Sequence, residues 1–197
     1  MGRPHEERRD QIVESALELA AEVGVKKVTT QAIADRVGIA QPTVFRHFKN
    51  RDEIFVAAIG WVAERLFGVL EGVFSADAPA EARLRQVIER QLALISSHKG
   101  IPRLLFSDRL HAESPRLKAV VRQVMDRYTT RVANLIEEGK AAGRMRADLD
   151  AQETARYVAA LVQGIVMRWS VYEFEFDLAA EAARLWDFLW SAIAQRD

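Results

Sequence analysis

Apolar residues recur every three or four positions along nearly the whole chain, which is the period of an amphipathic helix. Near the start, Ile12, Ala16, Leu19, Ala20 and Val23 share one face, and charged residues lie largely opposite. The strict alternation that is typical of a β-strand is almost absent. The pattern therefore predicts an all-α protein of about nine helices.

Gly, Pro and helix-capping side chains mark the boundaries of these helices. Gly24 and Gly38 are expected to end the first two, while Thr29, Asn50 and Ser114 can each cap the start of a helix. A break is expected at Gly100-Ile101-Pro102. The predicted helices cover residues 6–23, 30–37, 41–48, 51–74, 80–98, 102–111, 115–140, 151–172 and 178–195.

The second and third helices are short and are joined by a turn that contains Gly38. Ala32 and Ala34 are small enough to let two helices pack closely, and Val44 and Phe48 are placed to point inward. This is the layout of a helix-turn-helix. The side chains left outward, within reach of a major groove, are Gln41, Thr43, Phe45, Arg46 and His47.

Charge is distributed unevenly along the chain. Lys and Arg balance Asp and Glu at 28 each, which argues against a protein that coats nucleic acid over its whole surface. Residues 26–51, however, hold six bases and one acid, a net charge of +5. Such a run taken alone is usually a solvated helix face. Its coincidence with the helix-turn-helix favours a DNA-binding surface.

Residues 6–60 closely resemble the DNA-binding domain of TetR-family regulators. The matching positions are Thr29, Thr30, Ile33, Ala34, Gly38, Thr43, Val44, Phe45, His47, Phe48 and Lys49. The resemblance implies phosphate contacts from Thr29 or Thr30, His47 and Lys49, and base contacts from Gln41 and Thr43. The DNA-binding surface is thus predicted to comprise Arg3, Thr29, Thr30, Gln41, Pro42, Thr43, Phe45, Arg46, His47 and Lys49.

Two positions depart from the family pattern. Position 45 is commonly Tyr in the family, and Phe45 has no hydroxyl to reach a phosphate. Position 40 is commonly Ser, and Ala40 cannot cap the recognition helix. The fit to DNA is therefore expected to depend more on Lys49 and on an N-terminal arm that carries Arg3.

The family resemblance also implies two functional domains. Residues 1–50 would form the helix-turn-helix DNA-binding domain, and residues 51–197 would form a helical effector-binding and dimerisation domain. The expected function is that of a sequence-specific transcriptional regulator, a repressor that a small-molecule effector releases from a palindromic double-stranded operator. The helix at 51–74 would connect the two activities, because it begins beside the recognition helix.

The last two predicted helices are apolar nearly all round, so each must be covered on two sides. We expect each to pack on its own chain and on a second copy, as a homodimer. The alternative is a monomer with a larger core. The predicted interface residues are Val158, Leu161, Val162, Ile165, Trp169, Leu185, Trp186, Leu189 and Ile193.

The effector site is predicted from apolar and aromatic residues with a few polar neighbours, so the effector is expected to be largely apolar. The candidates are Trp61, Phe67, Leu105, Phe106, Arg109, Met125, Tyr128, Gln163 and Met167. Arg109 and Gln163 are the residues expected to orient a ligand. The alternatives are a plain core for the apolar set and internal hydrogen bonds for the two polar residues.

Other function classes find less support. An enzyme would need a nucleophile with its base, paired carboxylates or a metal cluster, but the four His are scattered, Cys is absent and no Gly-rich phosphate loop follows a strand. An architectural DNA-binding protein is usually basic throughout, and a helical adaptor would not need the basic helix-turn-helix. We expect a cytoplasmic protein with no cofactor, no metal, no catalytic residue and no membrane span.

Overall fold

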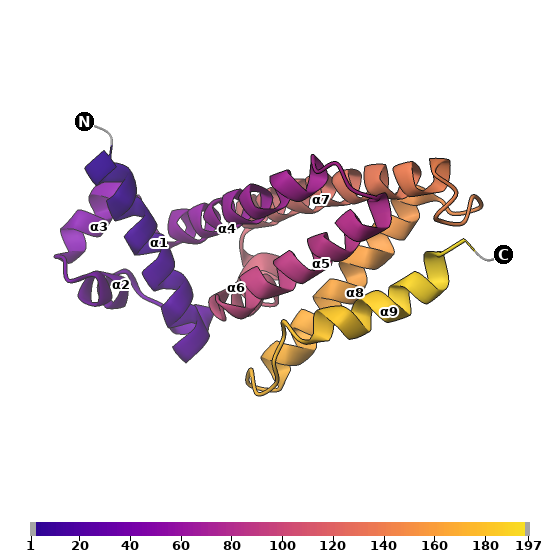
Figure 1. Ribbon diagram of the computed structural model, residues 1–197. Coiled ribbons are helices and arrows are strands. Elements are labelled where there is room, and N and C mark those ends of the chain that lie inside the picture. The colour runs from indigo at the N-terminus through magenta and orange to yellow at the C-terminus, as the bar shows by residue number, and fades with distance from the viewer. Residues whose placement is uncertain (1–2, 196–197) are drawn as a thin grey trace. The chain divides into compact units, whose positions relative to one another are not determined.

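The computed structural model describes residues 3–195, with side chains from residue 5 onward. In this range it contains nine α-helices, a 3₁₀ turn and a short π-helix (Figure 1). They are α1 (Arg3–Val23), η1 (Val25–Lys27), α2 (Thr30–Val37), α3 (Gln41–His47), α4 (Arg51–Phe74), α5 (Ala80–Ser96), α6 (Gly100–Leu105), η2 (Arg109–Glu113), α7 (Pro115–Ala141), α8 (Ala151–Val171) and α9 (Glu181–Ile193). Within residues 3–195 the pairing of extended segments is limited to one isolated β-bridge, between Met145 and Ala194. The all-α prediction is confirmed.

Side-chain caps set the starts of the helices where the sequence predicts them. Thr29 Oγ1 accepts the Ala32 N–H at 3.0 Å, and Asn50 Oδ1 accepts the Glu53 N–H at 2.9 Å. Asp150 Oδ1 accepts the Glu153 N–H at 2.7 Å. Each bond satisfies a backbone N–H that has no partner inside its helix.

The turn of the helix-turn-helix depends on Gly38, which has a φ of 73°. This left-handed conformation strains residues that carry a Cβ. The Gly38 N–H donates to Ala34 O and Asp35 O, so the last turn of α2 is closed before the chain turns toward α3. The predicted end of α2 at residue 37 is confirmed.

Several boundaries differ from the prediction, and the largest differences concern α6 and α9. The expected break between the two helices is present, but it lies at residues 97–99 rather than at 100–102, because Gly100 and Pro102 belong to α6. The helix predicted at 102–111 is also shorter, since α6 ends at Leu105 and residues 109–113 form η2. The last helix begins at Glu181 rather than at 178, since Asp177 Oδ1 accepts the N–H groups of Ala179 and Ala180 within a turn that precedes the helix.

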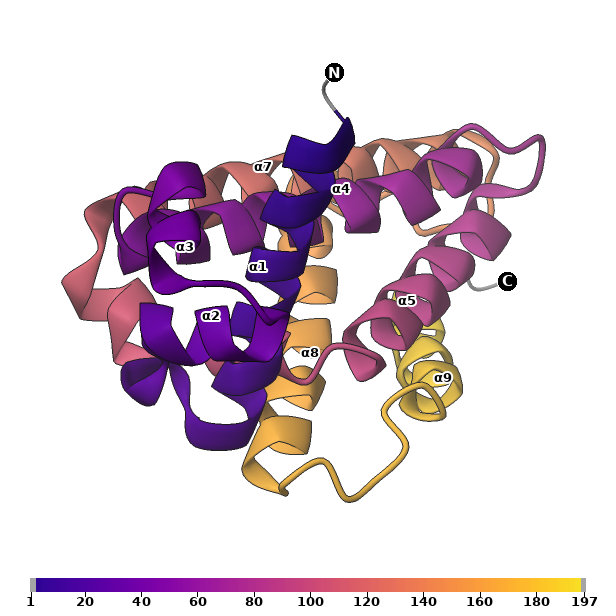
Figure 2. The same cartoon turned by 90° about the vertical axis from the view of Figure 1, so that its left-hand side faces the viewer.

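The chain forms two compact units. The first comprises residues 1–65 and 98–122, and the second comprises residues 66–97 and 123–197. This division does not follow the functional boundary expected at residue 50, which stays a prediction. In the first unit α1 packs on α2 and on α6, and α2 packs on α3 (Figure 2).

The core of the first unit is closely packed where α6 meets α1. Gly100 is buried, and a Cβ at this position would lie 2.0 Å from the carbonyl oxygen of Leu17. Ile12, Ile33 and Val44 are fully buried in the same unit. Gly100 is therefore required by a close approach of two backbones, rather than by a turn.

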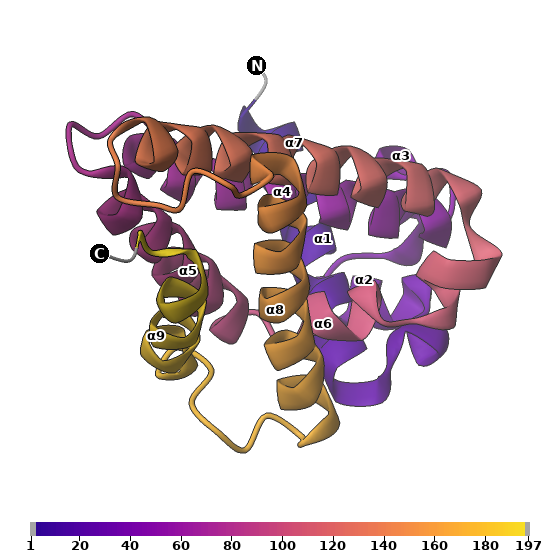
Figure 3. The same ribbon diagram turned by 90° about the vertical axis from the view of Figure 1, so that its right-hand side faces the viewer.

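In the second unit α5, α8 and α9 pack on one another (Figure 3). Arg83, which is 7% exposed, donates to Glu138 and thereby links α5 to α7. Val158, Trp169 and Leu185 are among the buried apolar side chains. None of the helices in residues 3–195 is both long and apolar enough to cross a membrane.

We predict that Gly100→Ala lowers the free energy of unfolding by about 3 kcal/mol or more, because overpacking against an immobile backbone cannot relax cheaply. Gly72→Ala is the matched control. A Cβ at Gly72 in α4 meets nothing within 4 Å, and Ala is favoured in a helix by about 1 kcal/mol. Urea unfolding of both variants checks the prediction, and equal stabilities would contradict it.

Candidate nucleic-acid interface

The side chains of α3 divide between the core and the surface. Val44 and Phe48 are buried, whereas Pro42, Phe45 and Arg46 are exposed. Gln41, Thr43 and His47 are half-buried. The predicted division into inward and outward residues is confirmed, so α3 offers a continuous surface for recognition of another molecule.

The N-termini of α2 and α3 are joined by side chains. Gln41 Nε2 donates to Thr30 Oγ1 at 2.9 Å, and Thr29 Oγ1 accepts the Ala32 N–H. Because each threonine oxygen accepts in these bonds, its hydroxyl hydrogen is left to donate outward. Such donors at a helix N-terminus suit the oxygen atoms of a phosphate.

The positive charge that this surface leaves uncompensated is smaller than the net charge of +5 counted for residues 26–51. Arg36 donates to Glu22 through Nη1 and Nη2 at 2.7 and 2.5 Å and lies 3.4 Å from Glu18, so its charge is balanced by α1. Arg46 and Lys49 are exposed, and neither forms an ion pair within residues 5–195. They are the cations that α3 and its C-terminal neighbour leave available to an anion.

The recognition helix lacks a side-chain cap, as the sequence predicts. Ala40 is the N-cap residue of α3 and makes no side-chain hydrogen bond. Pro42 fits the first turn because its missing N–H would have no partner there. Phe45 is 48% exposed, so its ring, with no hydroxyl, lies on the recognition surface.

His47 has an unusual environment for a phosphate ligand. Its ring centroid lies 4.4 Å from that of His5, and its Nδ1 is buried with no partner in the described chain. Burial, followed by the charges of His5, Arg9 and Arg8, lowers the pKa of His47. The free imidazole is therefore neutral at pH 7, with Nδ1 enclosed.

Arg9 contributes to this surface, although it is not among the DNA contacts predicted from the sequence. Arg9 Nη1 donates to His47 O at 2.7 Å, and the guanidinium lies 4.3 Å from the Phe48 ring centroid. A cation here is favoured by the partial negative charge at the C-terminus of α3. Arg9 lies three and four residues before the buried Ile12 and Val13, and this spacing places it on the same face of α1 as the core. This spacing could have indicated its position from the sequence.

Arg3, the remaining predicted DNA contact, has a side chain that lies outside the described residues.

The candidate effector residues are spread over both compact units. Trp61, Leu105, Phe106 and Arg109 belong to the first unit, and Phe67, Met125, Tyr128, Gln163 and Met167 belong to the second. Several have internal contacts. Tyr128 Oη donates to Gln91 Oε1 at 2.7 Å, and burial raises the pKa of Tyr128. Arg109 Nη2 lies 2.9 Å from Asp52 Oδ1, so the internal pairing left open by the sequence is present.

Trp61 is the most informative of the candidates. It is 5% exposed, its Nε1 is buried with no acceptor in the described chain, and its ring lies edge-on to His98 with the centroids 5.4 Å apart. The Arg65 guanidinium lies 3.5 Å from the ring centroid. Phe106, Met125 and Met167 are exposed instead.

The side chains predicted for a dimer interface lie mainly in the core of their own chain. Seven of the nine are buried, namely Val158, Val162, Trp169, Leu185, Trp186, Leu189 and Ile193. Leu161 and Ile165 are half-buried. The large apolar residues that α8, α9 and the residue after α8 leave exposed are Tyr157, Met167, Val171, Tyr172 and Phe188.

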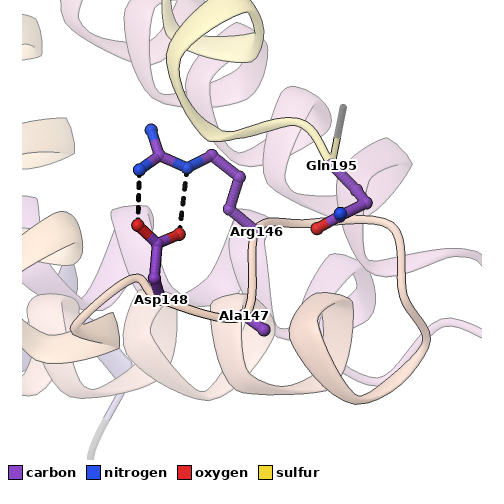
Figure 4. Close-up of a pocket in the computed structure, with 4 residues that line it drawn as sticks. All are labelled: Arg146, Ala147, Asp148 and Gln195. Atoms are coloured by element: carbon purple, nitrogen blue, oxygen red, sulfur yellow. Dashed lines mark hydrogen bonds and ion pairs between the residues drawn. The ribbon is translucent and has the colours of Figure 1, made fainter. Parts of the chain in front are cut away.

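A surface hollow of about 490 Å³ lies beside the C-terminal end of α9, where the Arg146 N–H donates to Ile193 O (Figure 4). It is lined by Arg146, Ala147, Asp148 and Gln195. Arg146 binds both carboxylate oxygens of Asp148, at 3.0 and 2.6 Å, so its charge is already compensated. No predicted effector residue lines this hollow.

The sequence matches two family models. The model "Bacterial regulatory proteins, tetR family" matches residues 12–58, and "Tetracyclin repressor-like, C-terminal domain" matches residues 77–170. A curated relative, nucleoid occlusion factor SlmA of Marinomonas sp. (strain MWYL1), is 25% identical over 99% of this chain and 97% of its own.

Solved structures share the fold at low sequence identity. A putative transcriptional regulator from Saccharomonospora viridis, in complex with choline, has a TM-score of 0.84 and 24% identity over 97% of this chain and 100% of its own. The transcriptional regulator FadR from Bacillus subtilis, in complex with stearoyl-CoA, has a TM-score of 0.79 and 21% identity over 93% and 98%. Because both its N-terminal and its C-terminal parts are matched, the protein belongs to the TetR family and is a DNA-binding regulator of the helix-turn-helix type.

Proposed function

We propose that this protein is a homodimeric repressor that binds a palindromic operator through α3 and the N-terminus of α2, and that it acts in the cytoplasm as a binding protein rather than as an enzyme. TetR regulators bind operator DNA and small-molecule effectors, typically as dimers. The proposal extends these family properties to named residues of this chain.

One observation carries the DNA-binding assignment. The outward side of α3 gathers groups that can donate to DNA around an exposed surface, with Gln41 held by Thr30 at 2.9 Å and Arg46 and Lys49 free of internal ion pairs. Lys49 and the threonine hydroxyls suit phosphate oxygens, while the Gln41 amide suits a base edge. We assign phosphate contacts to Thr29, Thr30, Lys49 and His47.

The palindromic operator follows from the proposed dimer. A two-fold dimer presents two identical recognition helices, and these fit half-sites one helical turn apart, about 34–36 Å. The exposed apolar residues Tyr157, Met167, Val171, Tyr172 and Phe188 support a dimer interface on α8 and α9. Their burial would remove apolar surface from water, and about 1.5–3 kcal/mol is gained for each large side chain that becomes fully buried.

We propose that the effector is largely apolar and carries an acceptor for the Trp61 indole. A buried N–H without a partner costs about 1–3 kcal/mol, and a ligand oxygen placed there would recover this energy.

A second candidate function comes from the relatives named nucleoid occlusion factor, which match nearly the whole chain at 21–25% identity. DNA binding would then serve nucleoid occlusion rather than transcription. Deletion of the gene, followed by measurement of transcripts next to the bound sites, separates the two. Unchanged transcripts at every bound site would favour the second candidate.

Selection of DNA from a random pool tests the proposed function, with the wild type expected to enrich a palindrome. Binding should weaken as salt rises, with log K falling by about 0.9 per phosphate neutralised for each unit of log salt.

Lys49→Ala should flatten this slope and weaken all sequences alike. Gln41→Ala should relax one base position in each half-site, and Thr30→Val, which removes its partner, should relax the same position. Identical effects of Lys49→Ala and Gln41→Ala would contradict the division of roles.

The pH dependence of operator binding tests His47. A phosphate favours the imidazolium, so the pKa of His47 should be higher in the complex than its depressed value in the free protein. Affinity should then be greatest at acid pH and fall as the pH rises through the pKa of the bound state. The stability of the free protein is expected to have the opposite pH dependence and to be lower at acid pH. The unfolded chain binds the proton more tightly, so stability falls as the pH drops through the ordinary His range. Titrations with His47→Gln check both trends, and unaltered pH profiles would clear His47 of both roles.

The oligomeric state tests the interface. Phe188→Asp and Val171→Asp should give folded monomers, because these side chains are 64% and 65% exposed in the single chain. Leu189→Asp should instead unfold the protein, since Leu189 is 4% exposed. Val69→Asp in α4, which also replaces an exposed apolar residue, is the control and should leave the dimer intact. Analytical ultracentrifugation checks the set, and a dimeric double variant of Phe188 and Val171 would contradict the interface.

A further inference from the structure

Three consecutive residues at the start of α4 each bind a different segment of the first unit. Arg51 Nη1 donates to Lys26 O at 3.1 Å and to Val28 O at 2.8 Å, in the turn just before α2. Val28 directly precedes Thr29, the residue that caps α2. The first residue of α4 therefore holds the backbone that leads into the proposed phosphate-binding N-terminus.

The second residue, Asp52, binds the segment that leads into α7. Its Oδ1 accepts from Arg109 Nη2 at 2.9 Å, and its Oδ2 accepts from Ser114 Oγ at 3.0 Å. Ser114 Oγ also accepts the Leu117 N–H at 3.2 Å, so one hydroxyl links Asp52 to the first turn of α7. The Asp52 carboxylate thus fixes the starts of two long helices to each other.

The third residue, Glu53, connects α7 with the end of the recognition helix. Its Oε2 accepts the Lys49 N–H at 2.9 Å, and its Oε1 lies 3.7 Å from Arg116 Nη1. Lys49 is one of the proposed phosphate ligands. A displacement of Arg116 would therefore act on a carboxylate that also holds the backbone of Lys49.

The segment bound by Asp52 has an uncommon backbone. The Ser114 N–H donates to Arg109 O at 2.9 Å, five residues back, and closes the π-helix η2. Turns of this kind are rare and often occur at functional sites. The Arg109 side chain is 14% exposed, and its guanidinium lies 5.5 Å from the centroid of the Phe55 ring, so the arginine side of the ion pair is shielded from solvent, whereas the Asp52 side chain is 33% exposed.

We propose that Arg51, Asp52 and Glu53, here named the α4 junction, are positioning residues for DNA binding that couple the first turn of α7 to α2 and to Lys49. This inference rests on the proposed DNA-binding function and adds to it residues that touch no DNA. Coupling through the junction is reciprocal. A change at the start of α7 alters the placement of the DNA ligands, and bound DNA must in turn restrain the start of α7.

Hydrogen exchange in the full-length protein tests the junction, with the operator selected from random DNA as the probe. Operator binding should slow amide exchange in peptides that span residues 110–121 by about fivefold, the lower end of typical coupling between sites. Asp52→Asn should abolish this response and weaken operator binding several-fold. Glu64→Gln is the matched control, because it removes the same charge from an exposed position of the same helix and should change neither quantity.

Arg116→Glu provides a second variant that is safe for folding, since the Arg116 side chain is 65% exposed. It places like charges together at Glu53 and should also reduce the exchange response. Wild-type protein that binds the operator without slowed exchange at 110–121 would overturn the junction alone. A full response in both Asp52→Asn and Arg116→Glu would overturn it equally. Failure of the wild type to bind any selected DNA would instead overturn the proposed function.

Discussion

The close approach of Gly100 to the backbone of Leu17 is the constraint on which the first unit depends. It brings α6 against α1, and α1 is the helix on which α2 packs. Residues 98–122 are consequently part of the same compact unit as the helix-turn-helix, although they lie far along the chain. The DNA-binding helices of this protein are therefore stabilised by a segment that a division at residue 50 would assign elsewhere.

Local sequence signals were sufficient where a structure is determined by neighbours in the chain. The Thr29 cap, the Gly38 turn and the inward positions of Val44 and Phe48 all follow from local chemistry, and each is confirmed. The structural role of Gly100 could not be predicted from local sequence. A glycine two residues before a proline favours a turn, and only the contact with Leu17, 83 positions away, shows that Gly100 permits packing inside a helix.

Side-chain partners that are distant in sequence account for most of the other differences. Arg36 counts toward the net charge of +5 in residues 26–51, but Glu22 compensates its charge in the structure. Arg109 was predicted to orient a ligand, but its Nη2 donates to Asp52. Periodicity shows that α8 and α9 must be covered on two sides. It does not show which side chains pack against their own chain and which against a second copy. The strongest apolar stripe was therefore predicted to form the dimer interface, whereas Leu189 and Trp169 belong to the core of their own chain.

The covalent chain is one route by which a change in one unit can reach the other. The chain passes between the units three times, and two of these crossings lie inside the continuous helices α4 and α7. A helix resists bending because each turn is held by backbone hydrogen bonds, so displacement at one end is carried to the other. Both helices begin in the first unit, where Asp52 and Ser114 bind their first turns together. An effector that shifts one of these helices must therefore either carry the other with it or break that hydrogen bond, and in both cases the change occurs one residue from Arg51, which holds the entry to α2.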